Sequence, residues 1–305
     1  VDESQDLPRS KQEFLLRAGR RLIIVGDVNQ AIYGFAGADV DSIPRMKQLL
    51  GVEASLTLTE TRRCGKAIVK EAQRVVKQFR AHESNCEGIV RYTNLENWAT
   101  EAADQDMVIC RVNAPLVSEA LKLVQAGRKA VIRGRDFGGS LVKFVKKFDA
   151  KTVPELIDFV SDWASRESSK EAAKKFPSDA RLIAIQDKAA CIGAFAEEAL
   201  SVEDVITAIN NVFAGKQCPR CKKSFNETTE QCFACKVALI RPEGIQFSSI
   251  HRAKGLEASR VFFIKNKSAP SPHPMAKLPW EVTQEWNALY IGITRAINEL
   301  VYVGD

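Results

Sequence analysis

The sequence predicts an α/β protein whose parallel sheet, flanked by helices, is interrupted by a helical, cysteine-bearing insertion. Three observations predict this class. Residues 22–25 form a short, continuous apolar run, which is typical of an interior parallel strand covered on both faces. Residues 115–132 read as a helix followed by a strand, the unit from which such sheets are built. From about residue 150 the pattern is purely helical, and strand signals return only after the cysteines, at "GIQFSSI".

The first strand signals place acidic residues at one edge of the sheet. Asp2 and Glu3 follow Val1, and Asp27 follows Val25. Because ligands bind beyond the carboxyl ends of parallel strands, we expect these carboxylates along one crevice. One or two carboxylates suffice to hold a magnesium–nucleotide complex, since Mg²⁺ prefers oxygen ligands and keeps several waters. A neighbouring glutamate can activate an attacking water. A solvated acidic turn is the alternative.

The later elements follow from periodicity and capping signals. Pro115 suits the first turn of a helix and Gly127 its end, and residues 130–132 extend as a strand. In the helical stretch, one helix is expected to begin at Thr152 and another at Ser201. A last helix precedes the closing strand, "ELVYV".

The composition indicates a globular protein rather than a disordered one. The chain has 305 residues, enough for two ordinary domains, with 45% apolar and 27% charged residues. No apolar run approaches the ~20 residues that cross a bilayer, so we expect no membrane partner and a cytoplasmic or nucleoid-associated location. The formal charge of +6 permits nucleic-acid binding without requiring it.

Half of the eight cysteines form a cluster with metal-ligand spacing. The segment "CPRCKKSFNETTEQCFAC" contains two C-x₂-C pairs separated by ten residues, which brings four thiolates within reach of one tetrahedral Zn²⁺. The predicted zinc ligands are Cys218, Cys221, Cys232 and Cys235. An iron–sulfur cluster and four unliganded thiols are the weaker alternatives. The scattered cysteines are expected to be buried and inert: Cys64, Cys86, Cys110 and Cys191.

Five segments in order, spread over nearly the whole chain, carry a resemblance to one family. They are "VDESQDL", "GDVNQAIYGFAGAD", "LTETRRCGKAI", "SSIHRAKGLEASRVFFI" and "EWNALYIGITRAINEL". In that order they resemble the Walker B motif and motifs III, IV, V and VI of superfamily 1 helicases of the UvrD/Rep/PcrA type. A single short motif would be weak evidence, but the ordered series is specific. The resemblance implies a RecA-like fold.

The resemblance implies catalytic roles for the matching residues. Asp2 matches the acid that coordinates Mg²⁺, Glu3 the residue that activates water, and Gln30 the sensor of the γ-phosphate. Arg63 and Arg295 match the two arginines that approach the γ-phosphate. A fixed guanidinium at this place can contribute on the order of 10³–10⁵ in rate.

Further residues are assigned to nucleotide binding. Asp27 shares the acidic crevice, and Gly255 and Glu257 lie in motif V, where the acid bonds the ribose. Arg62 stands where the family has a tyrosine that stacks on adenine. A planar guanidinium can also stack on a base, so we expect Arg62 to contact the nucleotide.

The resemblance also implies contacts to single-stranded DNA. Tyr33 and Phe35 match aromatics on which bases stack, each stack contributing ~1–3 kcal/mol. Ser249 and His251 match motif V positions near the DNA backbone. The alternatives are a core tyrosine and a structural histidine. The family often has Trp at the position of Phe35 and Arg at that of Ala36, so one contact to the strand is lost or supplied elsewhere.

The predicted domain organisation follows the motifs. Residues 1–50 correspond to the end of a first RecA-like domain, and residues 51–149 and 244–305 to the two parts of a second. Residues 150–243 form the insertion, with a zinc-ribbon-like segment at 216–237. Basic residues surround its first cysteine pair, which suggests that it touches duplex or forked DNA: Lys216, Arg220, Lys222 and Lys223.

The implied activity is that of an ATP-dependent DNA helicase or translocase, moving 3′→5′ on single-stranded or forked DNA with ATP, Mg²⁺ and a structural Zn²⁺. No G-x-x-x-x-G-K-[ST] sequence occurs. We therefore expect the C-terminal part of a longer helicase, poorly active alone, whose Walker A region lies in the same or a partner chain. Two alternatives stay open. One is a non-catalytic DNA-binding or regulatory half of a split helicase. The other is the helicase part of a helicase–nuclease or of an RNA-directed enzyme.

Overall fold

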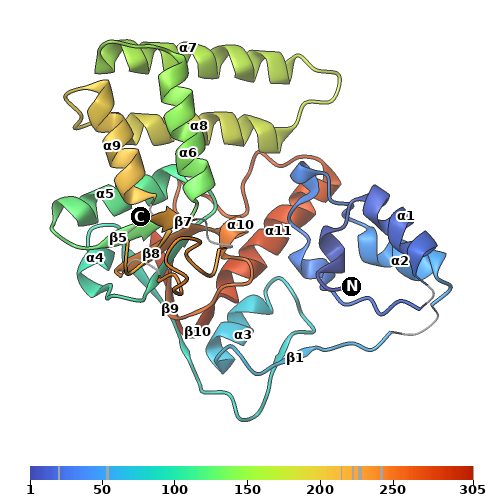
Figure 1. Cartoon of the computed structure of the whole chain (residues 1–305). Coiled ribbons are helices and arrows are strands. Elements are labelled where there is room, and N and C mark those ends of the chain that lie inside the picture. The colour runs from blue at the N-terminus through green and yellow to red at the C-terminus, as the bar shows by residue number, and fades with distance from the viewer. Residues whose placement is uncertain are drawn as a thin grey trace.

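The centre of the protein is a six-stranded parallel sheet (Figure 1). The computed structural model describes residues 1–19, 21–52, 55–213, 215–221, 223–225, 229–240 and 243–304. The strand order is β3 (Ile89–Asn94), β10 (Ala296–Gly304), β9 (Ala258–Ile264), β4 (Met107–Cys110), β8 (Ile245–Ser249) and β5 (Ala130–Ile132). Every neighbouring pair is parallel, as the helix–strand unit at residues 115–132 predicts.

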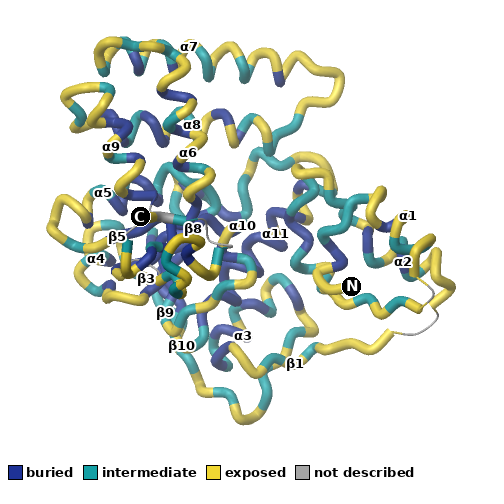
Figure 2. The backbone as a smooth tube through the Cα atoms, viewed as in Figure 1, coloured by how far each residue is buried: buried dark blue, intermediate teal, exposed yellow. Residues whose placement is uncertain are grey.

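Both faces of this sheet are buried (Figure 2). Val108 and Phe262 face one apolar cluster, whereas the next residues, Ile109 and Phe263, face the other. This alternation is the two-residue period of a strand. The first cluster includes α5 (Ala114–Gln125), α6 (Arg135–Lys147) and α9 (Val202–Val212). The second includes α3 (Lys66–Ala72), α10 (Ile250–Ala253) and α11 (Pro279–Ile293).

The insertion lies on the first face and ends in a small ribbon (Figure 1). Its long helices are α7 (Val153–Ala172) and α8 (Asp179–Ala196). The predicted helix starts are confirmed, because Thr152 caps α7 and Ser201 forms a capping box with Asp204 at α9. In the ribbon, β6 (Lys216–Gln217) pairs antiparallel with β7 (Ser224–Phe225). None of the described helices has the length and apolar character needed to cross a membrane.

The N-terminal segment contains α1 (Arg9–Ala18), α2 (Ser42–Leu49) and three short 3₁₀ turns: η1 (Ser4–Asp6), η2 (Val28–Gln30) and η3 (Gly34–Ala36). The prediction of a buried interior strand at residues 22–25 is wrong. Val25 N–H donates to the Val1 carbonyl at 2.8 Å, so the two segments run side by side, but Ile23 and Val25 are exposed. Among the described residues no sheet forms around this pair, which leaves its apolar side chains at the surface.

The remaining elements are short. β1 (Glu60–Thr61) pairs in parallel with β2 (Arg80–Ala81), and α4 (Trp98–Glu101) precedes β4.

Candidate nucleotide and nucleic-acid sites

The acidic residues at the start of the chain form one hydrogen-bonded network. The Nε2 of Gln5 donates to the Glu3 carboxylate, and its Oε1 accepts from the Asp27 N–H at 3.0 Å. The Asp27 carboxylate accepts from Nε2 of Gln30, also at 3.0 Å. Glu3 has a left-handed backbone (φ 49°), a conformation enriched at functional sites. The structure thus joins Glu3, Asp27 and Gln30 through Gln5, which the sequence analysis missed, while Asp2 accepts from the Glu3 N–H at 2.8 Å.

A buried lysine links this network to the sheet domain. Lys254, which follows α10, is largely buried, with 7% of its side chain exposed. Its ammonium lies 2.5 Å from the Asp6 carboxylate and 3.2 Å from that of Glu3, and it donates to the Gln30 carbonyl at 3.0 Å. It also lies 5.3 Å from the centre of the Tyr33 ring. Burial raises the pKa of Asp6, and the hydrogen bond from Lys254 opposes that shift. The sequence analysis missed Lys254, although it stands inside motif V.

The two predicted arginines lie near Tyr290, whose surroundings also include Asp27, and both have partners there. Arg63 Nε pairs with the Glu257 carboxylate at 2.8 Å. Arg295 is buried after α11, where it donates to the carbonyls of Ile291 and Leu256 at 3.0 and 2.9 Å. Burial, followed by the charge of Arg63, lowers the pKa of Arg295 to about 10, so it stays charged at neutral pH. Among the described interactions, neither guanidinium contacts the acids at the start of the chain.

Two further predicted residues occupy turns. Gly255 has a φ of 81°, a backbone conformation that glycine adopts readily. The chain turns here, so that Lys254 contacts the N-terminal segment while Glu257 contacts Arg63 of motif IV. An Nη of Arg62 lies 2.7 Å from Nε2 of His82.

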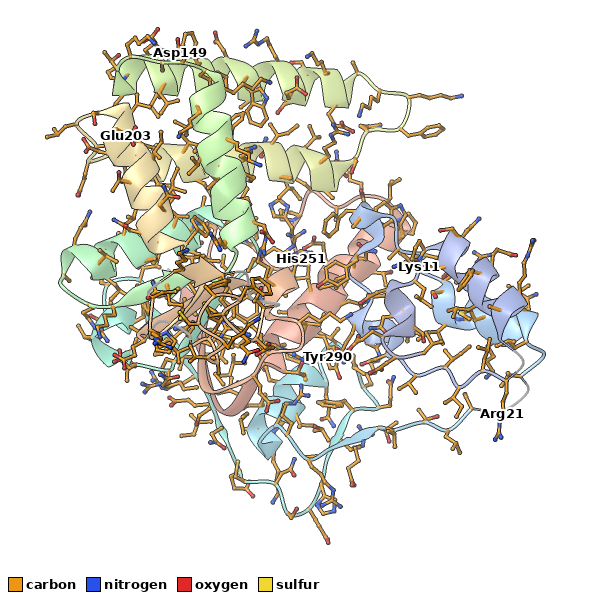
Figure 3. The ribbon with its side chains drawn as sticks, in the orientation of Figure 1. Lys11, Arg21, Asp149, Glu203, His251 and Tyr290 are labelled. Carbon is orange, nitrogen blue, oxygen red and sulfur yellow. The ribbon has the colours of Figure 1, made fainter. Side chains whose placement is uncertain are left out.

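All four residues predicted to bind DNA line one cleft of about 700 Å³. The rings of Phe35 and His251 meet edge to face at 5.3 Å, and Tyr33 lies 6.3 Å from each of them. The hydroxyl of Tyr33 donates to the His251 carbonyl at 2.7 Å. Phe35 is 56% exposed and free to stack on a base, whereas Ser249 is buried at the end of β8. Figure 3 labels His251, which belongs to α10.

Three further arginines also line the cleft: Arg111, Arg133 and Arg252. Arg111 and Arg133 directly follow β4 and β5, at strand ends where ligands bind in parallel sheets. The Arg111 Nε lies 2.9 Å from both oxygens of Glu285, which neutralises it, whereas Arg252 is exposed. Burial, followed by the charges of Arg111 and Arg252, lowers the pKa of His251 well below its usual range. The histidine is therefore neutral at physiological pH.

The insertion supplies the opposite wall of the cleft. Asp187 of α8 accepts from the backbone N–H groups of Asn113 and Ala114 at 2.8 and 2.7 Å. This carboxylate therefore caps the start of α5 and holds α8 against the sheet domain. The cleft-lining residues of α8 are otherwise small or apolar: Ala180, Ile183 and Ala184.

An asparagine holds motif III against the motif VI helix. The Nδ2 of Asn287 in α11 is buried and donates to the carbonyls of Val28 and Ala31 at 3.1 and 3.0 Å. The segment between the acidic network and the cleft aromatics is thus attached to α11.

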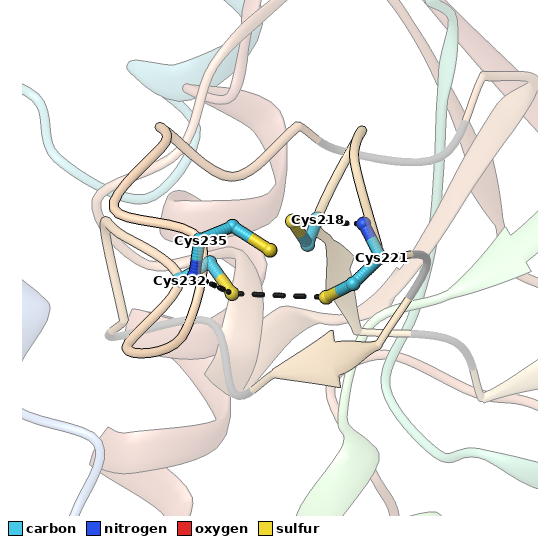
Figure 4. A group of neighbouring side chains, drawn as sticks. All are labelled: Cys218, Cys221, Cys232 and Cys235. Carbon is cyan, nitrogen blue, oxygen red and sulfur yellow. Dashed lines mark hydrogen bonds between the residues drawn. The ribbon is translucent and has the colours of Figure 1, made fainter.

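The cysteine cluster fits a tetrahedral metal (Figure 4). Its four sulfurs lie within 4.8 Å of one another, and those of Cys221 and Cys232 are 3.8 Å apart. In a tetrahedral site with Zn–S bonds of about 2.3 Å, neighbouring sulfurs are about as far apart as those of Cys221 and Cys232. The N–H groups of Cys221 and Cys235 each donate to the first sulfur of their own pair at 3.4 Å. Although burial acts to raise it, N–H donors from Cys221 and Arg220 lower the pKa of the Cys218 thiol to about 6, which favours the thiolate that a metal requires.

The scattered cysteines differ from one another. Burial raises the pKa of Cys64 to about 11 and of Cys110 to about 12, and it raises that of Cys191, as expected of inert thiols. The prediction is wrong for Cys86, which is exposed because it lies in the loop before β3.

Lys216 does not have the surface position suggested for it. It is buried, and its ammonium pairs with Glu230 at 2.7 Å and donates to the Thr229 carbonyl at 3.2 Å. Lys222 lies outside the described residues.

We expect Cys218→Ser to abolish stoichiometric zinc binding, because three thiolates and a hydroxyl no longer form a closed thiolate site. Metal analysis of the purified protein checks this. Cys86→Ser removes an exposed thiol outside the cluster and is expected to retain the metal. Equal zinc content in the two variants would exclude the cluster as the zinc site.

Two family models cover most of the chain. The UvrD-like helicase C-terminal domain matches residues 66–303, and the UvrD/REP helicase N-terminal domain matches residues 1–50. A search of curated proteins found no match. The parallel sheet flanked by helices agrees with a RecA-like α/β helicase fold. Because the first match spans well over half of the 305 residues, the chain belongs to the family of UvrD-like helicases.

Proposed function

We propose that the protein acts as an ATP-dependent DNA helicase or translocase that moves 3′→5′ on a single strand. The position of Lys254 carries the proposal. One buried ammonium contacts Glu3 and the Gln30 carbonyl of the acidic network, and also lies over the ring of Tyr33 in the cleft. A change of charge at the proposed nucleotide site would therefore alter the electrostatic environment of the residues proposed to bind DNA.

The side chains suggest how hydrolysis would be organised. ATP with Mg²⁺ supplies the phosphoryl-transfer chemistry when bound. Asp2 would hold the metal, and Glu3 would orient water and accept its proton. Gln30 would exchange its Asp27 partner for a phosphate oxygen. Arg63 would exchange Glu257 for the developing negative charge of the transferred group.

ATP binding also needs a phosphate loop from outside these residues, because no G-x-x-x-x-G-K-[ST] sequence occurs among the 305. The same observation favours a second candidate, a DNA-binding half that depends on a partner chain for catalysis. The two candidate functions differ in whether one polypeptide is sufficient for ATP hydrolysis.

The test is the steady-state ATPase of the complete gene product with and without single-stranded DNA or RNA, followed by translocation on strands of defined polarity. Stimulation by DNA and 3′→5′ movement support the proposal. Turnover only after a second chain is added supports the DNA-binding half, and stimulation by RNA alone contradicts a DNA helicase.

We expect Phe35→Ala to weaken binding of single-stranded DNA by about 1–3 kcal/mol, roughly fivefold to 150-fold, because one stacking surface is lost. Fluorescence anisotropy with a labelled oligonucleotide measures this. Phe14→Ala is the matched control, since Phe14 is similarly exposed (69%) but lies on α1, outside the cleft. An equal effect in both variants would remove Phe35 from the DNA site.

We expect Arg63→Ala to lower the DNA-stimulated kcat by about 10³-fold or more while DNA affinity is retained, because a positioned positive charge is lost from the transition state. Arg74→Ala is the control. Arg74 pairs with Glu71 at 2.9 Å much as Arg63 pairs with Glu257, but on α3 and its C-terminal turn. A kcat unchanged in Arg63→Ala would show that Arg63 serves only its ion pair.

A further inference from the structure

The ribbon exposes an aromatic ring that its own fold does not use. Phe233 lies in the loop between Cys232 and Cys235 and is 73% exposed. Its one aromatic neighbour among the described residues is Phe225, with ring centroids 6.0 Å apart. The cysteine cluster, rather than an apolar core, can hold the two loops together. A single exposed phenylalanine is ordinary, so its surroundings decide whether it has a role.

Those surroundings are basic. Arg220, Lys223 and Lys236 are exposed, and none of them forms an ion pair with another residue in the described part of the chain. Arg220 belongs to the first cysteine loop and Phe233 to the second. Because the four sulfurs lie within 4.8 Å, these loops form one end of the ribbon. An aromatic ring among unpaired cations is the combination that binds unpaired bases and phosphates.

The start of the ribbon lies near the edge of the cleft. Arg133 and Gly134 line the cleft, and the side chain of the next residue, Arg135, lies beside Gly215, where a Cβ added to the glycine would be 3.2 Å from its Cδ. Cys218 follows Gly215 by three residues, at most about 10 Å of extended chain. The first cysteine loop is therefore close enough to Gly134 for a strand that leaves the cleft there to reach it.

We propose that the cysteine end of the ribbon is a second nucleic-acid site, at which Phe233 stacks on an unpaired base beside the duplex junction of a forked DNA. Arg220, Lys223 and Lys236 contact the adjoining phosphates. The inference rests on the proposed function, because it takes the cleft as the path of the single strand. The ribbon is then the part of the protein that distinguishes forked DNA from single-stranded DNA.

The test compares Phe233→Ala with wild type in the complete protein, using a forked DNA and a short oligonucleotide that fills only the cleft. We expect fork affinity to fall roughly fivefold to 150-fold, the loss of one base stack, while affinity for the short oligonucleotide is unchanged. Phe233→Trp is expected to restore fork binding. Unchanged zinc content in Phe233→Ala shows that the ribbon is intact.

Phe176→Ala is the matched control. Phe176 is 80% exposed and lies beside Lys175, at 5.5 Å, but in the turn between α7 and α8. A second variant, Arg220→Glu with Lys223→Glu, is expected to weaken fork binding and to flatten its salt dependence, because fewer phosphates are neutralised. Fork affinity at the wild-type level in Phe233→Ala, or an equal loss in Phe176→Ala, overturns the inference alone. Failure of wild type to bind even the short oligonucleotide overturns the proposed function as well.

Discussion

The arrangement of both sites depends on one buried charge, the ammonium of Lys254. It is enclosed between the N-terminal segment and the sheet domain, where it meets the carboxylates of Asp6 and Glu3. Because the lysine is largely buried while its two partners reach solvent, removing either carboxylate would leave a desolvated ammonium with less compensation. The contact therefore holds the two parts of the chain in register. It also makes the acidic network and the cleft share a single ion.

A second constraint runs along α11. This helix of 15 residues is about 22 Å long. Arg295, just beyond its end, satisfies the carbonyl of Ile291, while Asn287 within it holds the backbone of motif III. The region of the predicted arginines and the loop that carries Tyr33 are thus attached to one rigid element. The Arg63–Glu257 pair keeps two predicted nucleotide contacts neutralised by each other in this conformation.

The insertion is joined to the sheet domain by a shared apolar cluster and by a polar contact at the start of α5. The Asp187 carboxylate caps α5, which places α8 as a wall of the cleft. The start of the ribbon, at Gly215, lies beside Arg135. As a consequence, the cleft is bounded by residues from three parts of the chain: the N-terminal segment, the strand ends of the sheet and the insertion.

The sequence by itself determined the features that depend on local spacing. The helix–strand unit at residues 115–132 indicated a parallel sheet, cap signals located the starts of α7 and α9, and paired cysteines specified the cluster. The ordered motifs identified the family. Only the tertiary structure decided that Lys254 meets Asp6, 248 positions away, that Glu257 is occupied by Arg63, and that Ile23 and Cys86 are exposed. The reason is physical: periodicity and spacing encode contacts within a few turns or one strand. Which residues far apart in sequence become partners depends on the strand order of the folded sheet and on which charged groups are buried together in it.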